Sequence, residues 1–439
     1  MLTVTGKVEQ GLAAYRRALT IDPAWAETHS DMIFAMDVLP EVTTADLQAA
    51  RRAFNRRHGV PRRCFHKPFA NVRDPDRVLR IGSVTADFRM NSAAFAFEPI
   101  LREMDRQAYE IYCYSGVIIE DEMTARCRAL ATAWRRTVGM DEETLADLIR
   151  ADGVDILVDM SGHSSGNRLT VFARRPAPVQ LSAWTHPHGI GLETMDYVFS
   201  DPVTIPASER GLFMERICDL PLVIPFRSPH EAPLVAPPPS IRSGRTTFGC
   251  LNRLTKVTAP VVALWARLLR LCPDADLLLK DRSLNDPAER RRMTDSFARH
   301  GIPAERLRFM GSSNRYDHLA AYGGVDIALD PFPLNGGVTT MEALWMGVPV
   351  VAMLGKATPA RVSAAIMTSI GLPDWAAENP DDYVAIAAAK AADRAELATL
   401  RSGMRELFLK SPAGDIGLYT RAVERAYRDM WRRWCREGG

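Results

Sequence analysis

The clearest chemical pattern in the chain is a glycine-containing turn that leads into a helix. After the apolar run VDIALD, the chain continues with Asn335-Gly336-Gly337, and a helix is expected to begin near Val338. Glycines let the backbone approach an anion closely, and the N–H groups and positive dipole end of a helix's first turn bind phosphate. Thr339 and Thr340 add hydroxyl donors. The pattern predicts a phosphate site, with a capped tight turn as the alternative.

Lys256 is the second candidate, because it follows the expected strand 247–251 in the loop before a helix. A diphosphate leaving group gains negative charge in the transition state, and a metal or a fixed cation must stabilise that charge. Lysine supplies a compact point charge. Glu342, one turn into the helix that begins near Val338, could accept a hydrogen bond from a ribose hydroxyl or could stabilise the helix N-terminus electrostatically.

Two patterns could indicate a metal, and we interpret neither as a metal site. Asp274-Ala275-Asp276 has the form of the motif that metal-dependent sugar transferases use, but it precedes the expected strand 275–280, at the amino end of the sheet. His186-Pro187-His188 has no third ligand nearby. A metal-independent mechanism with no cofactor is therefore predicted.

Candidate proton-transfer groups lie in the first half of the chain. The run DILVDMSGHSSGNRL ends a buried strand in a glycine-flanked loop that carries His163, and an imidazole at such a position suits general-base catalysis. A structural histidine is the alternative. Asp87 also follows an apolar strand and could accept or orient a proton, and His186 lies on the next loop of this kind.

The elements that must position these residues alternate between strand and helix. Short apolar runs separated by helical patterns occupy residues 77–223 and recur over residues 246–410, which predicts two parallel sheets covered on both faces. The intervening residues 224–245 contain six prolines and are expected to be a linker. Residues 411–439 are expected to form a C-terminal helix.

The resulting architecture is an α/β fold with two doubly wound, Rossmann-like domains. This is the arrangement of two-domain, B-type nucleotide-sugar glycosyltransferases, in which ligands are expected at the carboxyl ends of strands, facing the space between the domains. Residues 1–66 precede it as a short all-α segment. Its helix ending in ALTIDP, followed by a second helix, is similar to the end of a tetratricopeptide (TPR) repeat.

Composition excludes several classes of protein. Of 439 residues, 47% are hydrophobic and 25% charged, and 55 Lys and Arg nearly balance 53 Asp and Glu, so no global charge favours nucleic acid or membrane. The basic residues of 51–63 are interpreted as a solvated helix face because no aromatic residues interleave with them. Seven scattered cysteines, no signal-peptide pattern and no long apolar run predict a cytoplasmic protein.

Several motifs together carry a family resemblance. RIGSVTADF, DILVDMSGHSSGNRL, RRPAPVQ, MDY, LNRLTKVT and NGGVTTMEALWMGVPVV occur in the order typical of the SPINDLY and O-GlcNAc transferase family, over about residues 77–435. The resemblance implies an inverting, metal-independent transfer of a sugar from a nucleotide diphosphate to Ser/Thr hydroxyls of proteins. UDP-GlcNAc is the leading donor.

The resemblance also implies roles for individual residues. Lys256 is expected to hold the diphosphate, residues 335–340 to surround the phosphates, His318 to lie against the nucleobase, and Glu342 to bind the ribose. Arg253 stands three residues before Lys256, near where the family has a glutamine. His163 or a water held by Asp87 would accept the proton of the acceptor.

Departures from the family pattern keep alternatives open. Asn91 replaces a histidine found in animal-type members, and Gly337-Val338-Thr339 replaces the usual His-Thr-Thr. Glu342 and the Gly162-His163 pair are more similar to the SPINDLY branch, so a GDP-fucose-dependent protein O-fucosyltransferase is one alternative. A non-catalytic protein-binding relative and a sugar-nucleotide epimerase are the others. The sequence does not indicate an oligomeric state.

Overall fold

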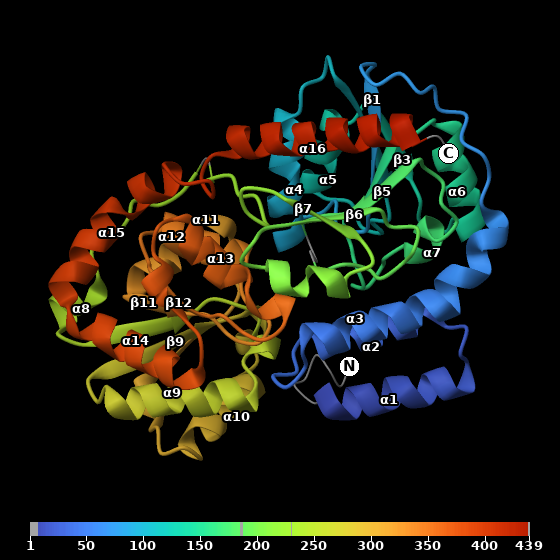
Figure 1. Cartoon of the computed structure of the whole chain (residues 1–439). Coiled ribbons are helices and arrows are strands. Elements are labelled where there is room, and N and C mark those ends of the chain that lie inside the picture. The colour runs from blue at the N-terminus through green and yellow to red at the C-terminus, as the bar shows by residue number, and fades with distance from the viewer. Residues whose placement is uncertain (1–7, 185–187, 230, 438–439) are drawn as a thin grey trace. The chain divides into compact units, whose positions relative to one another are not determined.

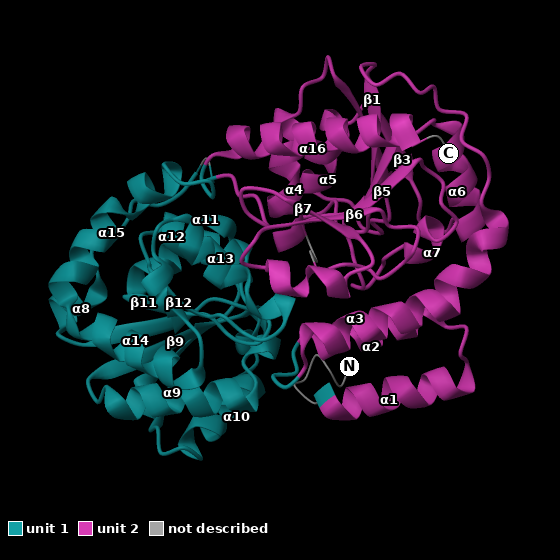
Figure 2. Cartoon of the chain, in the orientation of Figure 1, with its two compact units in different colours: residues 1–8, 38–41, 228–414 teal, residues 9–37, 42–227, 415–439 magenta. Residues whose placement is uncertain are grey.

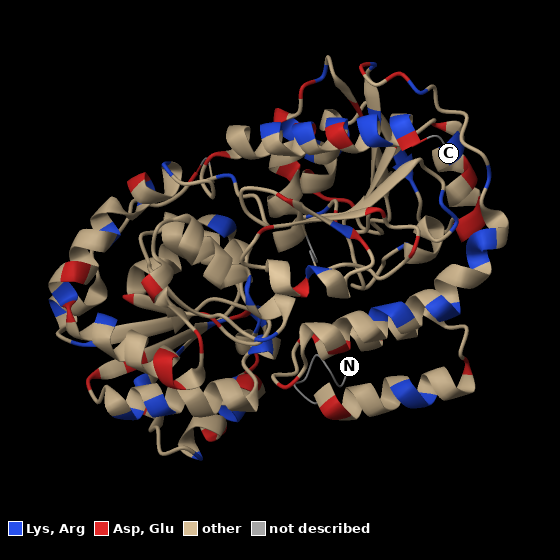
Figure 3. Cartoon of the chain, viewed as in Figure 1, with Lys and Arg blue, Asp and Glu red and all other residues tan. Residues whose placement is uncertain are grey.

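The structure is a computed structural model, and it describes residues 8–184, 188–229 and 231–437. The chain forms two compact units (Figure 2). Unit 2 comprises residues 9–37, 42–227 and 415–439, and unit 1 comprises residues 228–414 with short pieces at 1–8 and 38–41. Basic and acidic residues are distributed over both units (Figure 3).

Unit 2 is built around a seven-stranded sheet in the order β3-β2-β1-β4-β5-β6-β7, and every pairing in it is parallel. Almost every residue of its central strands is buried, as a sheet covered on both faces requires. The strands are β1 (Leu79–Thr85), β2 (Tyr109–Ser115), β3 (Ala133–Arg136), β4 (Ile156–Asp159), β5 (Val179–Ser182), β6 (Tyr197–Ser200) and β7 (Arg216–Asp219).

Helices of unit 2 come from three parts of the chain (Figure 1). The last helix, predicted within 411–439, belongs to this unit: the Trp184 indole nitrogen lies 3.2 Å from the Tyr419 hydroxyl, and the Tyr109 hydroxyl donates to Glu424 O at 2.8 Å. The helices are α1 (Val8–Ile21), α2 (Ala26–Met36), α3 (Thr44–Phe54), α4 (Ser92–Glu103), α5 (Glu122–Leu130), α6 (Glu142–Ala151), α7 (Leu169–Phe172) and α16 (Ile416–Glu437).

The first three helices confirm the predicted helical segment. Thr43 and Asp46 form a capping box at the start of α3, in which each side chain bonds the other residue's backbone N–H. Phe54 and Ile33 from this segment belong to the same buried apolar cluster as Leu157 of β4. The segment is therefore part of the core of unit 2.

Unit 1 contains a six-stranded, all-parallel sheet in the order β10-β9-β8-β11-β12-β13. The strands are β8 (Thr246–Cys250), β9 (Ala275–Lys280), β10 (Leu307–Met310), β11 (Ile327–Leu329), β12 (Val350–Met353) and β13 (Ala376–Ala377). Its helices are α8 (Pro239–Ser243), which lies within the predicted linker, α9 (Ala259–Leu271), α10 (Pro287–Ala298), α11 (Arg315–Ala320), α12 (Val338–Trp345), α13 (Val362–Ser369), α14 (Pro380–Ala392) and α15 (Arg394–Leu409).

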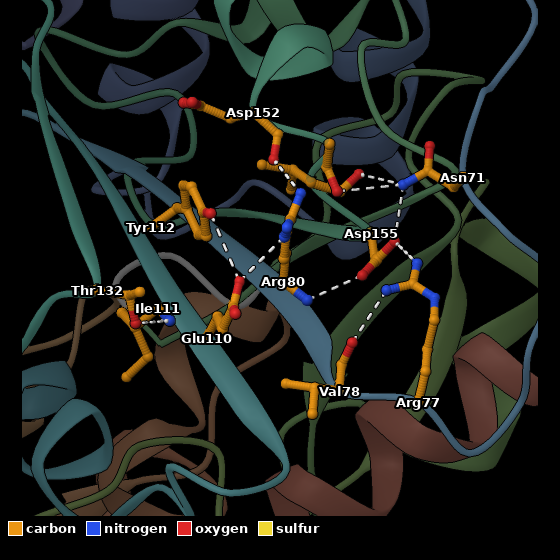
Figure 4. Close-up of polar contacts among 12 residues, drawn as sticks. Asn71, Arg77, Val78, Arg80, Glu110, Ile111, Tyr112, Thr132, Asp152 and Asp155 are labelled. Atoms are coloured by element: carbon orange, nitrogen blue, oxygen red, sulfur yellow. Dashed lines mark hydrogen bonds and ion pairs between the residues drawn. The ribbon is translucent and has the colours of Figure 1, made fainter.

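Ion pairs occupy the amino ends of both sheets. In unit 2, Asp155 accepts from the Asn71 amide at 2.7 Å and the Arg80 backbone at 2.8 Å, and it pairs with Arg77 (Figure 4). In unit 1, Asp276 near the start of β9 pairs with Arg245 at 2.8 Å and Arg308 at 2.7 Å. The Asp274-Ala275-Asp276 motif therefore lies at the amino end of its strand, where it was predicted.

Candidate active site

The strand order reverses direction at one point in each sheet. The reversal lies between β1 and β4 in unit 2 and between β8 and β11 in unit 1, because strands on either side of these pairs run outward in chain order. Ligands of doubly wound sheets bind at the carboxyl ends of the two strands at such a reversal. The loops that follow β1, β4, β8 and β11 are therefore the expected ligand-binding loops.

In unit 1, the loop after β8 meets the turn before α12. Lys256 is 8% exposed, and its Nζ donates to the Asn335 carbonyl oxygen at 2.6 Å. An ammonium has three N–H donors, so this bond leaves donors with which a phosphate oxygen could bond. Burial, with a smaller effect of Arg253, lowers the pKa of Lys256, whereas Asp330 raises it.

Asp330 immediately follows β11 and is 4% exposed. It accepts a 2.8 Å hydrogen bond from the Gly336 N–H. Burial raises the pKa of Asp330, and Lys256 opposes that effect. Asp330 thus holds the glycine turn and partly balances the lysine, two functions that the sequence analysis missed. The available signal was its position directly after the apolar run VDIAL.

Gly336 is required by close packing. A Cβ at this residue would lie 2.6 Å from Asp330 Oδ1 and 2.6 Å from Thr340 Oγ1, closer than carbon can approach either atom. Gly337 follows as the N-cap of α12, and no side chain caps the helix there. The first N–H groups of α12 are thus left for a ligand or solvent.

The two threonines of the predicted phosphate loop are held by neighbouring side chains. Thr339 Oγ1 accepts from the Asn252 amide at 3.1 Å, and Thr340 Oγ1 lies 2.9 Å from Ser363 Oγ. Val338 is buried at the first position of α12. Beside these residues is a cavity of about 20 Å³, large enough for a single water. It is lined by the ends of β8 and β11 and the start of α12.

The residues expected to bind the nucleoside also come together. Glu342 is 2% exposed, pairs with Arg315, and lies 3.3 Å from His318 Nε2 through its other oxygen. The structure therefore joins α11 and α12 through one carboxylate. Arg315 was not singled out by the sequence analysis. Arg253 is exposed.

In unit 2, Asp87 follows β1 in the loop before α4. Its Oδ1 accepts from the Asn91 amide at 2.6 Å and lies 3.5 Å from an Arg89 guanidinium nitrogen. Asn91 also caps α4 by accepting from Ala94 N at 2.9 Å. Asn91 therefore orients Asp87, which remains 19% exposed and able to reach a substrate.

His163, in the loop after β4, is buried and bonded at both ring nitrogens. Nδ1 lies 3.0 Å from the Ser30 hydroxyl of α2, and Nε2 lies 3.0 Å from the Ile190 carbonyl oxygen. Because a carbonyl only accepts, the neutral ring must carry its proton on Nε2 and accept from Ser30 at Nδ1. These contacts give His163 a structural function, and its assignment as the base stays a prediction that they do not support.

The β1 and β4 loops contact one another. Thr85 Oγ1 lies 3.1 Å from Ser161 Oγ and accepts from the Asp87 N–H at 3.1 Å. Asp159, at the end of β4, accepts from the Ser161 and Gly162 N–H groups at 3.2 and 3.0 Å. Burial raises the pKa of Asp159 to about 6. This second buried carboxylate was missed although it ends the apolar run DILV.

The helical segment holds the loop after β5. Gln48 of α3 donates to His188 O at 2.7 Å, and Arg51 lies 3.6 Å from Asp37. Glu215 accepts hydrogen bonds from the N–H groups of Ile190 and Gly191. The charge of Arg51 interacts favourably with that of Glu215. We call residues 188–193 with these partners the loop lock. His186 lies outside the described residues.

Within the described residues, no group of three or more His, Cys, Asp or Glu side chains is arranged to hold a metal ion. No helix in this part of the chain is both long enough and apolar enough to cross a membrane.

The chain has two doubly wound units, and one of them holds a buried lysine against a glycine turn at a helix N-terminus. These features are typical of two-domain glycosyltransferases. The model of glycosyl transferase family 41 matches residues 28–226 and 242–423. The chain belongs to this family.

Relatives and solved structures agree with this assignment. The chain is 34% identical over 428 residues to the probable UDP-N-acetylglucosamine--peptide N-acetylglucosaminyltransferase SPINDLY of Oryza sativa, covering 96% of this chain and 46% of the relative. It is 25% identical to the Arabidopsis thaliana protein SEC, covering 81% and 37% of the two chains. A Thermobaculum terrenum O-GlcNAc transferase mutant superposes with a TM-score of 0.93 at 34% identity, covering 100% of this chain and 84% of that one.

These comparisons confirm the predicted fold and family. Sucrose-phosphate synthase from Thermosynechococcus elongatus, at 13% identity and a TM-score of 0.51, shares the fold alone. The chain spans about half the length of the curated plant relatives that it matches.

Proposed function

We propose that this protein transfers a sugar from a nucleotide diphosphate to Ser/Thr hydroxyls of proteins, with inversion and without a metal. The single observation that supports this most strongly is the buried Lys256 ammonium held 2.6 Å from Asn335 O at the start of the glycine turn. A fixed cation beside helix N–H groups can stabilise the phosphate that leaves, which is the function a metal would otherwise serve.

UDP-GlcNAc is the proposed donor. This proposal is supported by the plant relatives, which are named as probable UDP-N-acetylglucosamine--peptide N-acetylglucosaminyltransferases, and by the similar O-GlcNAc transferase structure. Unit 1 would bind the donor. Lys256 and the N–H groups of residues 337–339 would contact the diphosphate, and Glu342, with His318 and Arg315, would contact the nucleoside.

Unit 2 would accept the proton of the acceptor hydroxyl. Of the two predicted groups, Asp87 is the better candidate because it is partly exposed and its other carboxylate oxygen can bind a water or the hydroxyl itself. The acceptor oxygen would bond to the anomeric carbon as the bond from that carbon to the diphosphate oxygen breaks. The electron pair of that bond would leave on the phosphate, which Lys256 stabilises.

The test is a transfer assay with UDP-GlcNAc and a Ser/Thr-containing protein mixture in the presence of EDTA, read by mass spectrometry. Sugar-modified hydroxyls formed by the wild type and lost in Asp87→Asn are expected. Transfer that requires an added metal, or transfer from GDP-fucose alone, would refute the corresponding part of the proposal. Release of free sugar without an acceptor would indicate an epimerase or hydrolase instead.

A further inference from the structure

The helical segment of unit 2 contains a groove that the proposed chemistry does not use. The groove has a volume of about 730 Å³ and is formed by α1, α2, α3 and the turn that follows α3. We call it the arginine groove, and its lining residues are Arg16, Leu19, Thr20, Pro23, His29, Met32, Ala53, Arg56 and Arg57.

The arginine groove is positively charged and has no acidic residue in its lining. Arg16, Arg56 and Arg57 are exposed, and among the described residues none of the three has a carboxylate within 4.0 Å. Many other arginines of unit 2 are paired, as Arg63 is with Glu193. Figure 3 shows basic residues on α1, on α3 and on the helical turn that follows α3. Uncompensated like charges repel one another, so an anionic ligand would stabilise this arrangement.

Electrostatic effects inside the segment agree with this potential. Burial is the main cause that lowers the pKa of His29 and of His58 to about 4, and the charge of Arg57 is a smaller contributor to that value in both cases. His29 lines the groove. The positive potential therefore extends from the groove surface to the buried histidine pair behind it.

The apolar residues of the groove resemble those of a protein interface. Leu19 and Met32 line it; outside the lining, Ile21 at the end of α1 and Trp25 at the N-cap of α2 have side chains that are 79% and 50% exposed. Arginine, tryptophan and methionine are enriched where proteins bind one another. One exposed tryptophan does not form the row of stacking platforms typical of single-stranded nucleic-acid sites.

We propose that the arginine groove binds an acidic, extended segment of a protein, and that this segment belongs to the acceptor. The second half of this statement rests on the proposed function. Carboxylates of the segment would pair with the three arginines, and its apolar side chains would contact Leu19 and Met32. The groove would then select acceptors by an acidic sequence outside the modified hydroxyl.

The experiment measures fluorescence anisotropy of two labelled peptides on the full chain. One peptide alternates glutamate with alanine around a central leucine, and the other carries lysine in place of glutamate. The variant is Arg56→Glu with Arg57→Glu. Its control is Arg291→Glu with Arg425→Glu, which changes the charge equally at exposed arginines of α10 and α16.

We expect the wild type and the control to bind the glutamate peptide, and the groove variant to bind it about tenfold more weakly or not at all. Binding should also weaken as salt is raised. Equal binding of both peptides, or equal loss in the control, would overturn the proposal. Preferential binding of a single-stranded oligonucleotide, abolished in the groove variant, would replace it with a nucleic-acid site.

UDP calorimetry on the same samples separates this proposal from the proposed function. The groove variant should bind UDP as the wild type does, because the donor residues lie in unit 1. If no sample binds UDP while the glutamate peptide still distinguishes the variants, the proposed function fails and the peptide-binding groove stands. If the samples bind UDP but the glutamate peptide does not distinguish the groove variant from the control, the groove proposal alone is refuted.

Discussion

Lys256 Nζ lies 2.6 Å from the carbonyl oxygen of Asn335, although 79 residues separate the two in the chain. One residue follows β8 and the other precedes α12, so this bond joins the two loops at the strand reversal of unit 1. The bond holds the charged Nζ of Lys256 at the turn that leads into α12. The donor site proposed above depends on this arrangement.

Gly336→Ala should weaken nucleotide binding with a modest loss of stability. The added Cβ would lie 2.6 Å from both Asp330 Oδ1 and Thr340 Oγ1, so the turn whose Asn335 carbonyl accepts from Lys256 must shift. We expect UDP affinity measured by calorimetry to fall at least about tenfold, since each charge-assisted hydrogen bond contributes about 1.5–3 kcal/mol. Gly403→Ala is the control, because a Cβ there meets no atom within 4 Å. Wild-type affinity in Gly336→Ala would show that the turn does not bind phosphate.

UDP affinity should decrease as the pH rises through a range in which an ordinary lysine would still be protonated. Burial lowers the pKa of Lys256, and the neutral amine cannot pair with phosphate. A free lysine stays protonated to about pH 10, so a decrease between about pH 7 and about pH 9 identifies a buried group. The measurement is a calorimetric titration across that range. A flat profile there would mean that Lys256 keeps its proton or does not touch the ligand.

Gln48→Ala should slow sugar transfer without changing UDP affinity. Gln48 donates to His188 O at 2.7 Å and so helps to hold the loop after β5, whereas the proposed UDP-binding residues lie in unit 1. Small misplacements of positioning elements cost large factors in rate, and we expect about a tenfold decrease in kcat. Gln10→Ala, at an exposed position of α1, is the control. An unchanged kcat would show that the loop lock does not affect catalysis.

Much of this arrangement could be predicted from the sequence because the signals were local. The run VDIALD followed by Asn335-Gly336-Gly337 indicated a strand, a turn and a helix start, and the structure has β11 and α12 there. Lys256 was singled out because it follows a strand. Inner strands such as β4, β11 and β12 are short apolar runs, which can be predicted without long-range information.

The contacts that the sequence did not reveal are those between distant segments. His163 looked like a base because of its glycine-flanked loop, but Ser30, 133 residues earlier, bonds its Nδ1. Arg315 is one of several surface arginines until α11 brings it to Glu342. Strand β3 has the sequence AWRR, and an edge strand with exposed polar residues carries no apolar pattern.

The buried histidine pair should make unfolding depend on pH. His29 Nδ1 lies 3.1 Å from His58 Nε2, and burial lowers the pKa of both to about 4. An unfolded histidine takes up its proton near pH 6.5. Between these pH values the unfolded chain binds more protons than the folded one. The histidine pair therefore lowers the free energy of unfolding of the protein as the pH falls.

His58→Asn removes part of this pH dependence of the free energy of unfolding. The free energy of unfolding of the wild type, relative to the variant, should decrease by at least about 1 kcal/mol between about pH 7 and about pH 4.5. Comparing the two proteins cancels the opposite contribution of buried carboxylates such as Asp37 and Asp159, whose pKa burial raises to about 6. Urea unfolding at several pH values measures the difference. A constant difference would mean that the histidines are accessible to protons in the folded state.

The measurement that tests the central claim most directly is calorimetric binding of UDP and GDP, with EDTA present, to the wild type and to Lys256→Ala. Lys410→Ala, at a side chain 74% exposed, is the matched control. The proposed function predicts UDP binding by the wild type and the control, weakened by at least about tenfold in Lys256→Ala while the circular dichroism spectrum is unchanged. Equal affinity in all three proteins, or no binding of either nucleotide, would contradict a donor site built on Lys256.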